Sequence, residues 1–231
     1  MIRLATVCAR KNSKGLIGKN KLLINGLPLF AWAIIQAKKS NYFHTIVVTT
    51  DDDEIIEMSY KYGADLTVKR PLELSTDTSG KPETILHALK EVEKVLGLQF
   101  DVVVDLDVTS PLRSIEDIKG AVNLLEQNKV SSVLSVCHSR RNPYFNIPEV
   151  DKAKSIKVSK SNGAAYLSRQ SAPECFDMNA AVHVWRARSL KKNPKIIFKD
   201  TLLYVMPSER SWDIDSQFDF EVVKFLSERN N

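Results

Sequence analysis

The segment Phe100 to Leu106, FDVVVDL, constrains the fold of this chain more than any other stretch of the sequence. It is nearly all apolar and lacks the polar–apolar alternation of a half-exposed strand, so a strand formed here must be covered on both faces. Strands of this kind belong to parallel sheets, which carry helices on their two sides. The segment therefore predicts an α/β protein whose sheet is mostly parallel.

The first two-thirds of the chain fit the same class, because short β-branched runs alternate with amphipathic stretches, as in repeated βαβ units. We expect further strands at 2–7, 45–50, 66–68 and 130–137, and helices that start near Pro28, Asp51 or Asp52, Pro82 and Ser114. The prediction is a single domain over residues 1–231 with a Rossmann-like, mostly parallel sheet flanked by helices.

The alternation stops between residues 138 and 178. This segment contains polar turns, prolines at positions 143, 148 and 173, and the strand-like run KSIKVSK. We interpret it as a smaller excursion inserted into the main sheet. Regular structure resumes at 180–185 and 201–206, and a last helix is expected over 216–229.

Charge and composition narrow the possible partners. The formal net charge of +5 would attract an anionic partner. The chain has no run of five cations and no aromatic–basic platform, so we expect no nucleic acid. No apolar stretch approaches the roughly 20 residues of a membrane span, and the first strand follows Met1 without a secretory leader. We therefore expect a cytoplasmic protein that does not insert into membranes.

The first loop, CARKNSKGLIGKN, is the strongest candidate for binding an anion. It carries Arg10, Lys14 and Lys19 beside Gly15 and Gly18, directly after the first strand. It does not match the P-loop pattern, because its glycines are too close together and an asparagine replaces the hydroxyl residue. Its amides and cations could surround a polyphosphate, and a solvated surface loop is the alternative.

Two further loops, TTDDD and DVTSPLR, follow predicted strands in the same way. In an open parallel sheet, ligands bind outside the carboxyl ends of the strands. The three loops are therefore expected to meet at one edge, where they would form the functional site.

Two pairs of carboxylates could hold a metal ion. Asp213 and Asp215 in SWDIDSQFDFE lie two residues apart, so an extended backbone would point both to one face. Asp105 and Asp107 have the same spacing at the end of the buried strand. Magnesium takes one or two carboxylates from a protein and completes its octahedron with phosphates and water. The alternative for the first pair is that one aspartate only caps the last helix.

The motifs occur in an order that resembles one family. ARKNSKG with KN, then NG-P, a strand ending in TTD, KRPLELSTDT, TSPLR and DID-x-x-x-D together resemble the acylneuraminate cytidylyltransferases, over nearly the whole chain. The resemblance implies an enzyme that joins CTP to a nine-carbon α-keto acid sugar, releasing pyrophosphate. It further implies Mg²⁺ as cofactor and a homodimer formed through the excursion at 138–178.

The resemblance also implies roles for individual residues. Arg10 and Lys19 would act in catalysis by holding the triphosphate, and Asp213 and Asp215 would hold the metal ion. Nucleotide binding would use Arg10, Lys14, Lys19, Asn20, Arg70 near the cytosine, and Asp107. Sugar binding would use Arg169, Gln170 and Asn179.

This sequence departs from many sialic-acid members of the family. Asp107-Val108 stands where they carry glutamine-proline, Phe145 lies near the place of a common cation, and an arginine is replaced around Asp177. A less polar pocket suits a deoxygenated sugar, so the motifs are closer to the bacterial branch that activates legionaminic acid. The alternatives are a cytidylyltransferase for 3-deoxy-manno-octulosonate and a non-catalytic nucleotide- or RNA-binding module.

Overall fold

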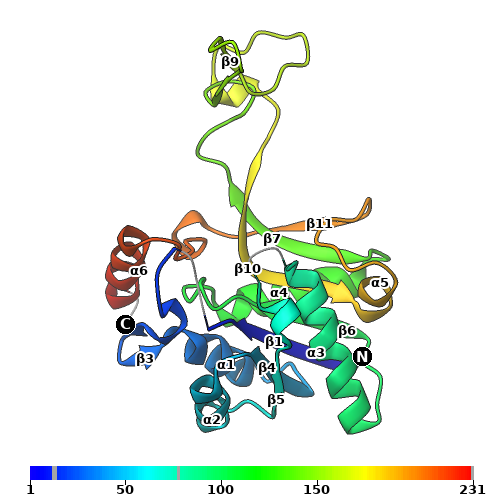
Figure 1. Ribbon diagram of the computed structural model, residues 1–231. Coiled ribbons are helices and arrows are strands. Elements are labelled where there is room, and N and C mark those ends of the chain that lie inside the picture. Colours follow the sequence, from blue (N-terminus) through cyan, green and yellow to red (C-terminus); the bar gives the residue numbers. More distant parts are fainter. Residues whose placement is uncertain (12–14, 77–78, 230–231) are drawn as a thin grey trace.

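A computed structural model describes residues 1–11, 15–76 and 79–229. Its centre is a seven-stranded sheet in the order β11-β7-β10-β6-β1-β4-β5 (Figure 1). The strands of the described chain are β1 (Arg3–Ala9), β4 (Thr45–Thr50), β5 (Leu66–Lys69), β6 (Val102–Leu106), β7 (Ser132–His138), β10 (Phe176–Arg186) and β11 (Leu202–Val205). Only β10 runs antiparallel to its neighbours, so the prediction of a mostly parallel sheet is confirmed.

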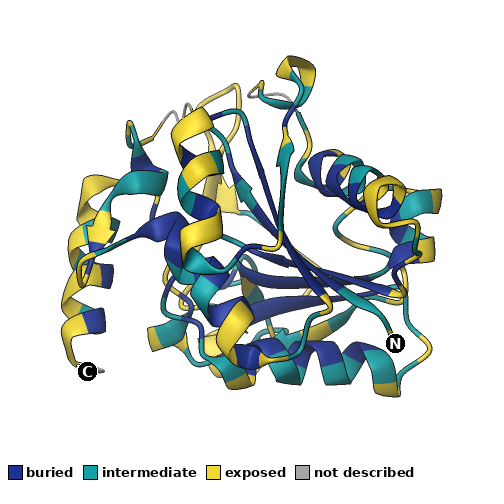
Figure 2. Cartoon of the chain, turned by 90° about the horizontal axis from the view of Figure 1, so that it is seen from below, coloured by how far each residue is buried: buried dark blue, intermediate teal, exposed yellow. Residues whose placement is uncertain are grey.

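Helices cover both faces of this sheet, as Figure 2 shows by their buried inner sides. The helices are α1 (Leu29–Ser40), α2 (Asp53–Tyr62), α3 (Lys81–Leu96), α4 (Ile115–Gln127), α5 (Ala187–Lys192) and α6 (Gln217–Arg229). Side chains of α1, α2, α4 and α6 pack in one core cluster, and side chains of α3 and α5 pack in the other. The fold is therefore a three-layer α/β arrangement.

The central strand β6 contributes to both cores. Val102 and Val104 belong to the cluster that contains α1 and α4, whereas Val103 belongs to the cluster that contains α3. Successive side chains of a strand point to opposite faces, so an apolar run is needed when both faces are covered. The prediction drawn from FDVVVDL is thus confirmed.

The helix starts follow local capping chemistry. Asp52 caps α2 through the amide of Glu54, and Ser114 forms a reciprocal capping box with Asp117 at the start of α4. Several boundaries differ by a few residues from the sequence prediction, and β10 begins at Phe176 rather than near residue 180. Strand β1 extends to Ala9 because it pairs with β4 up to Thr50, and α3 begins one residue before the predicted proline.

An arm formed by residues 139–175 projects from the ends of β7 and β10 (Figure 1). It contains the short hairpin β8 (Pro148–Val150) and β9 (Ile156–Val158), so the run KSIKVSK does supply a strand. A second hairpin, β2 (Leu23–Ile24) with β3 (Leu27–Pro28), precedes α1. In the described residues, no helix is both long and apolar enough to cross a bilayer.

Asp117 joins α4 to the segment before α6. Its carboxylate is 1% exposed and accepts two hydrogen bonds from Arg210, at 2.9 and 3.0 Å. Burial by itself would raise the pKa of Asp117, but the bonds from Arg210 and Ser114 lower it below the usual value. Its ionised form therefore stabilises the fold above the pKa of an unfolded aspartate, and this contribution is lost as pH falls through the lower folded pKa.

We predict that Asp117→Asn lowers the free energy of unfolding at pH 7 by about 2 kcal/mol, because a charge-assisted pair to a buried carboxylate is lost. Urea denaturation should show the full difference at pH 7 and a smaller one at pH 3. Asp53→Asn is the control, since Asp53 occupies the first turn of α2 but pairs with Lys69 at an exposed site. An equal loss for the two variants would contradict the prediction.

Candidate active site

The loops after β1, β5 and β6 meet at the carboxyl edge of the sheet and line a pocket of about 350 Å³, here called the smaller pocket. Its lining includes five residues predicted from the sequence to bind a nucleotide: Arg10, Lys19, Asn20, Arg70 and Asp107. The predicted meeting is thus observed for the loops after β1 and β6. The TTDDD loop after β4 contacts the first loop, because Asp51 accepts from the amide of Lys11 at 2.7 Å, but it does not line the pocket. Lys14 lies outside the described residues.

The side chain of Lys19 connects the first loop to the far end of the chain. Its ammonium donates to the carbonyl of Ile214 at 2.7 Å and to a carboxylate oxygen of Asp215 at 3.0 Å. Lys19 is 8% exposed, so both acceptors compensate a desolvated charge. These bonds fix the ammonium at the rim of the smaller pocket, where it can meet a phosphate without reorganising.

Arg10 and Asn20 form hydrogen bonds that hold the first loop in place. The Asn20 amide donates to the carbonyl of Arg10 at 2.8 Å, and Arg10 donates to the carbonyl of Thr76 at 3.3 Å. The first bond ties the two ends of the loop together. The second joins the first loop to the segment before α3, and both of its residues line the smaller pocket.

Arg70 lies deeper in the smaller pocket. It is 7% exposed and donates to the carbonyl of Thr49 at 3.1 Å, while its Nε has no hydrogen-bond partner among the described residues. A buried donor without a partner costs free energy unless a ligand satisfies it. Arg70 therefore offers a ready donor to an acceptor on a bound molecule.

A lysine that sequence reasoning missed binds both carboxylates at the end of β6. The ammonium of Lys81 lies 2.6 Å from Asp105 and 2.5 Å from Asp107. Burial would lower the pKa of Lys81, but the two carboxylates raise it well above its usual value. Burial likewise opposes ionisation of Asp107, yet the charge of Lys81 brings the pKa of this carboxyl well below its usual range. Lys81 and Asp107 are therefore both charged at neutral pH.

His183 of β10 lies in register with Asp105 on the neighbouring strand. It is 2% exposed, and neither ring nitrogen has a hydrogen-bond partner in the described part of the chain. Burial, and then the charge of Lys81, lower the pKa of His183 to about 4. The ring is therefore neutral beneath the charged cluster.

The TSPLR motif has a structural role in this fold. Arg113 is 2% exposed and donates to the carbonyls of Asp107 and Ala181, at 2.6 and 2.9 Å. Burial lowers the pKa of Arg113 to about 10, so it stays charged at neutral pH. It lies just before α4 rather than in its first turn, and it holds the loop after β6 against β10.

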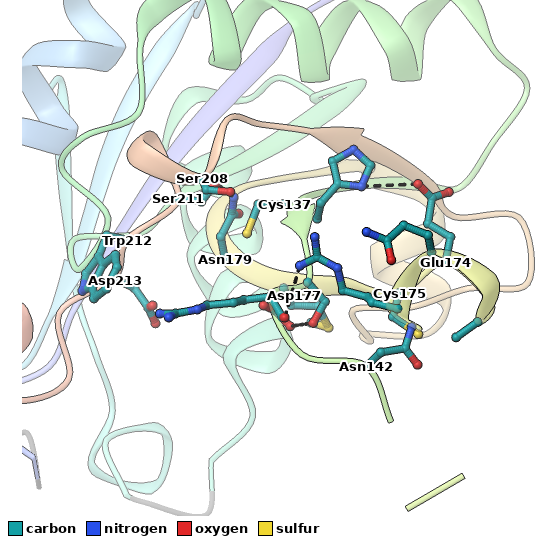
Figure 3. A pocket seen from close by; sticks show the side chains of 17 residues that line it. Cys137, Asn142, Glu174, Cys175, Asp177, Asn179, Ser208, Ser211, Trp212 and Asp213 are labelled. Atoms are coloured by element: carbon teal, nitrogen blue, oxygen red, sulfur yellow. Dashed lines mark hydrogen bonds and ion pairs between the residues drawn. The ribbon is translucent and has the colours of Figure 1, made fainter. Parts of the chain in front are cut away.

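A second, larger pocket of about 840 Å³ lies at the base of the arm. Figure 3 shows Trp212 and Asp213 at one end, and Glu174 and Cys175 of the arm at the other. The predicted sugar contacts Arg169, Gln170 and Asn179 all line it. The nucleotide candidates and the sugar candidates thus line two different pockets.

The side chains of these three residues differ in exposure and in hydrogen bonding. Arg169 and Gln170 are exposed in the arm, and Arg169 donates to the carbonyl of Arg140 at 3.3 Å. Asn179 is 2% exposed, and its amide binds Ser135, Ala181 and Ser211 at the bulge of β10. Its side chain therefore fixes the floor of the larger pocket, close to the segment that carries Asp213.

The segment Asp213-Ile214-Asp215 joins the two pockets. Ile214 is fully buried and its amide donates to the carbonyl of Thr109 at 2.9 Å, which anchors the segment beside the loop after β6. Asp213 lines the larger pocket, and Asp215 binds Lys19 of the smaller one. The predicted alternation, with Ile214 inward and the aspartates outward, is observed.

The two aspartates suit a divalent cation. Burial, and next the charge of Asp215, raise the pKa of Asp213, so additional positive charge beside Asp213 would be favourable. Among the described residues, no group of three or more potential metal ligands occurs. A metal ion at this pair would thus need oxygen atoms from a substrate and water, which matches the ligand preference of Mg²⁺.

The fold and the charged pockets define a nucleotide-processing α/β enzyme. Residues 4–204 match the family Cytidylyltransferase, and the chain belongs to this family. It is therefore a nucleotidyltransferase, as the sequence motifs predicted.

Individual relatives carry more specific names than the family does. The chain is 40% identical over 228 residues to the CMP-N,N'-diacetyllegionaminic acid synthase of Campylobacter jejuni, covering 99% of this chain and 96% of that protein. The same values hold for the post-translational flagellin modification protein B of Campylobacter coli. The N-acylneuraminate cytidylyltransferase of Escherichia coli is 31% identical, with 99% of this chain matching 52% of that protein.

A solved structure supports the fold assignment. CMP:2-keto-3-deoxy-manno-octonic acid synthetase, solved with CTP, superposes with a TM-score of 0.72 over the whole of both chains. The sequence identity is 13%, so the match concerns the fold alone.

We predict that Gly15→Ala weakens CTP binding by about tenfold, because a Cβ at this position would lie 2.4 Å from the backbone oxygen of Asp215. The methyl group would push the first loop away from the Asp213–Asp215 segment and loosen Lys19. Isothermal titration calorimetry measures the affinity, and thermal unfolding checks that the fold is kept. An unchanged affinity in the folded variant would show that the close contact has no part in binding.

Proposed function

We propose that this chain transfers CMP from CTP to a nine-carbon α-keto acid sugar of the nonulosonic class and releases pyrophosphate. The observation that carries the proposal is the junction of two pockets at the Asp213–Asp215 segment, one rich in cations and one formed with the arm. A reaction between a triphosphate and a sugar acid needs such a junction, because the two substrates must meet at the α-phosphorus.

The smaller pocket takes the nucleotide in this proposal. Arg10 and Lys19 hold the β- and γ-phosphates, with Lys14 and Asn20 at the same loop, and Arg70 donates to the cytosine. The fixed position of Lys19 supports its part, since a preorganised cation stabilises charge that develops on a leaving group. Asp107 faces the ribose or the base.

The larger pocket takes the sugar. Arg169 and Gln170 offer exposed donors there, while Asn179 acts through the shape of the floor. The C2 hydroxyl of the sugar attacks the α-phosphorus in line, so that an O–P bond forms as the bond to pyrophosphate breaks and the hydroxyl gives up its proton. Mg²⁺ held by Asp213 and Asp215 would supply positive charge to the phosphate oxygens.

Within the nonulosonic class, we favour a legionaminic acid derivative. Two relatives named for CMP-N,N'-diacetyllegionaminic acid synthesis match almost their full length, at 40% and 30% identity. The N-acylneuraminate cytidylyltransferase of Escherichia coli is matched over about half of its length. The cation absent near Phe145 in the sequence motif fits a sugar with fewer hydroxyl groups.

We further propose a cytoplasmic homodimer in which the arm contacts a second copy. Several apolar side chains of the arm are exposed: Val150 at 67%, Ile156 at 75% and Leu167 at 92%. Such exposure is costly for an isolated chain and is relieved when another surface covers it.

A substrate panel tests the proposal. The purified protein is incubated with CTP, Mg²⁺ and one of four acids: N-acetylneuraminic, N,N'-diacetyllegionaminic, pseudaminic or 3-deoxy-manno-octulosonic acid. We predict pyrophosphate release and CMP-sugar formation, with the highest kcat/KM for the legionaminic derivative. Preference for the octulosonate would move the chain to the alternative enzyme class. Binding of RNA without turnover of any sugar would support a binding module instead.

We predict that Arg10→Ala and Asp215→Asn each lower kcat by about 10²- to 10³-fold, the usual loss for one preorganised charge contact. Pyrophosphate release measured at saturating CTP and sugar gives this value. Lys61→Ala, in the exposed last turn of α2, serves as the control and should keep wild-type turnover. Unchanged turnover of the Arg10 and Asp215 variants would remove both residues from the site.

A further inference from the structure

The ammonium of Lys81 stands in an unusual position for a cation. Lys81 is the first residue of α3, where the helix dipole and the free amides favour negative charge. The α3 N-cap, Gly80, has no side chain that could offset this. A lysine here is therefore unfavourable locally, and its stabilisation must come from elsewhere in the fold.

That stabilisation comes from Asp105 and Asp107, which share the ammonium between them at 2.6 and 2.5 Å. Asp105 has no exposed surface, and its other oxygen accepts from Thr6 at 3.0 Å and from the Cys8 thiol at 3.3 Å. The other oxygen of Asp107 accepts from the amide and hydroxyl of Thr109. Both carboxylates are thus oriented so that one oxygen each remains for a shared cation.

A pair of oriented carboxylate oxygens is also what a divalent metal ion needs. Lys81 fills the space between them with a single positive charge that needs no ion from solution. We propose that Lys81 takes the place of a second metal ion at the Asp105–Asp107 pair and binds the nucleotide directly. The reaction then uses one metal ion, at Asp213 and Asp215, and one fixed ammonium.

The direct contact with the nucleotide follows from the donors of Lys81. An ammonium group carries three N–H donors, and the two carboxylates account for at most two of them. Lys81 also lines the smaller pocket, with 27% of its side chain exposed. The remaining donor can meet an oxygen or ring nitrogen of the nucleotide. The carboxylate of Asp107, beside this ammonium, can still accept a hydrogen bond. Lys81 and Asp107 therefore offer a bound nucleotide a donor next to an acceptor.

The first test asks whether Lys81 excludes a metal ion. In a background of Asp213→Asn with Asp215→Asn, the proposed main metal pair is neutral, and Mn²⁺ binding is followed by electron paramagnetic resonance. We expect no bound Mn²⁺ while Lys81 is present and one Mn²⁺ per chain after Lys81→Ala. The added Asp107→Asn should remove that ion again.

Lys38→Ala is the matched control, because Lys38 pairs with Asp65 at an exposed site away from the smaller pocket. Mn²⁺ binding while Lys81 is present, or no binding by the folded Lys81→Ala protein, would overturn the replacement of a metal ion. Since this test needs neither sugar nor turnover, its result does not depend on the proposed function.

The second test asks whether Lys81 binds the nucleotide, and it leaves no charge on Asp105, the carboxylate without exposed surface. Lys81→Met combined with Asp105→Asn removes one charge of each sign, so the net charge of the pocket is unchanged. We expect CTP affinity in EDTA, measured by calorimetry, to fall at least about tenfold, the effect of one hydrogen bond from a charged group. Unchanged affinity in this variant would overturn the direct contact. A wild-type chain that binds CTP but transfers CMP to no sugar would overturn the proposed function alone.

Discussion

This site depends on two bonds that the Lys19 ammonium donates, one to the backbone carbonyl of Ile214 and one to the side chain of Asp215. They join the first loop of the chain to the segment before the last helix, and both ends are anchored separately. Lys19 follows the parallel strand β1, and Ile214 is buried and bound to the loop after β6. Because neither end can shift alone, the smaller pocket and the Asp213–Asp215 segment keep a fixed relation to each other.

The other buried cations are likewise held in place by acceptors within the protein. Arg70 and Arg113 donate to backbone carbonyls, and Lys81 binds two carboxylates, so each desolvated charge has an acceptor before any ligand arrives. Desolvation makes such contacts stronger than at an exposed surface, but it also makes each unpaired donor costly. A polyanion entering this pocket would meet charges already in position, which is how binding energy becomes transition-state stabilisation.

The sequence predicted the parts of this structure that local patterns determine. The apolar segment FDVVVDL has to be covered on both faces of the sheet. Ser114 and Asp117 are spaced as a capping box, and the alternation around Ile214 separates one buried side chain from two carboxylates. The rule that loops meet at the carboxyl edge of a parallel sheet then placed the loops after β1 and β6 at one pocket, whereas the loop after β4 does not line it. None of these inferences needed a contact between residues distant in the sequence.

The parts that sequence reasoning missed depend on such distant contacts. Lys81 and Asp105 are 24 positions apart, and β10 enters the sheet antiparallel between β6 and β7, which its own residues do not indicate. Asn179 belongs to the region that the resemblance assigns to sugar recognition, and its contacts with Ser135 and Ser211 across the bulge in β10 also depend on distant parts of the chain. One signal for Lys81 was present: a cation at the first position of a helix opposes the helix dipole. A residue that opposes its local structural preference must be stabilised by tertiary contacts. For Lys81 those contacts are the carboxylates at the pocket.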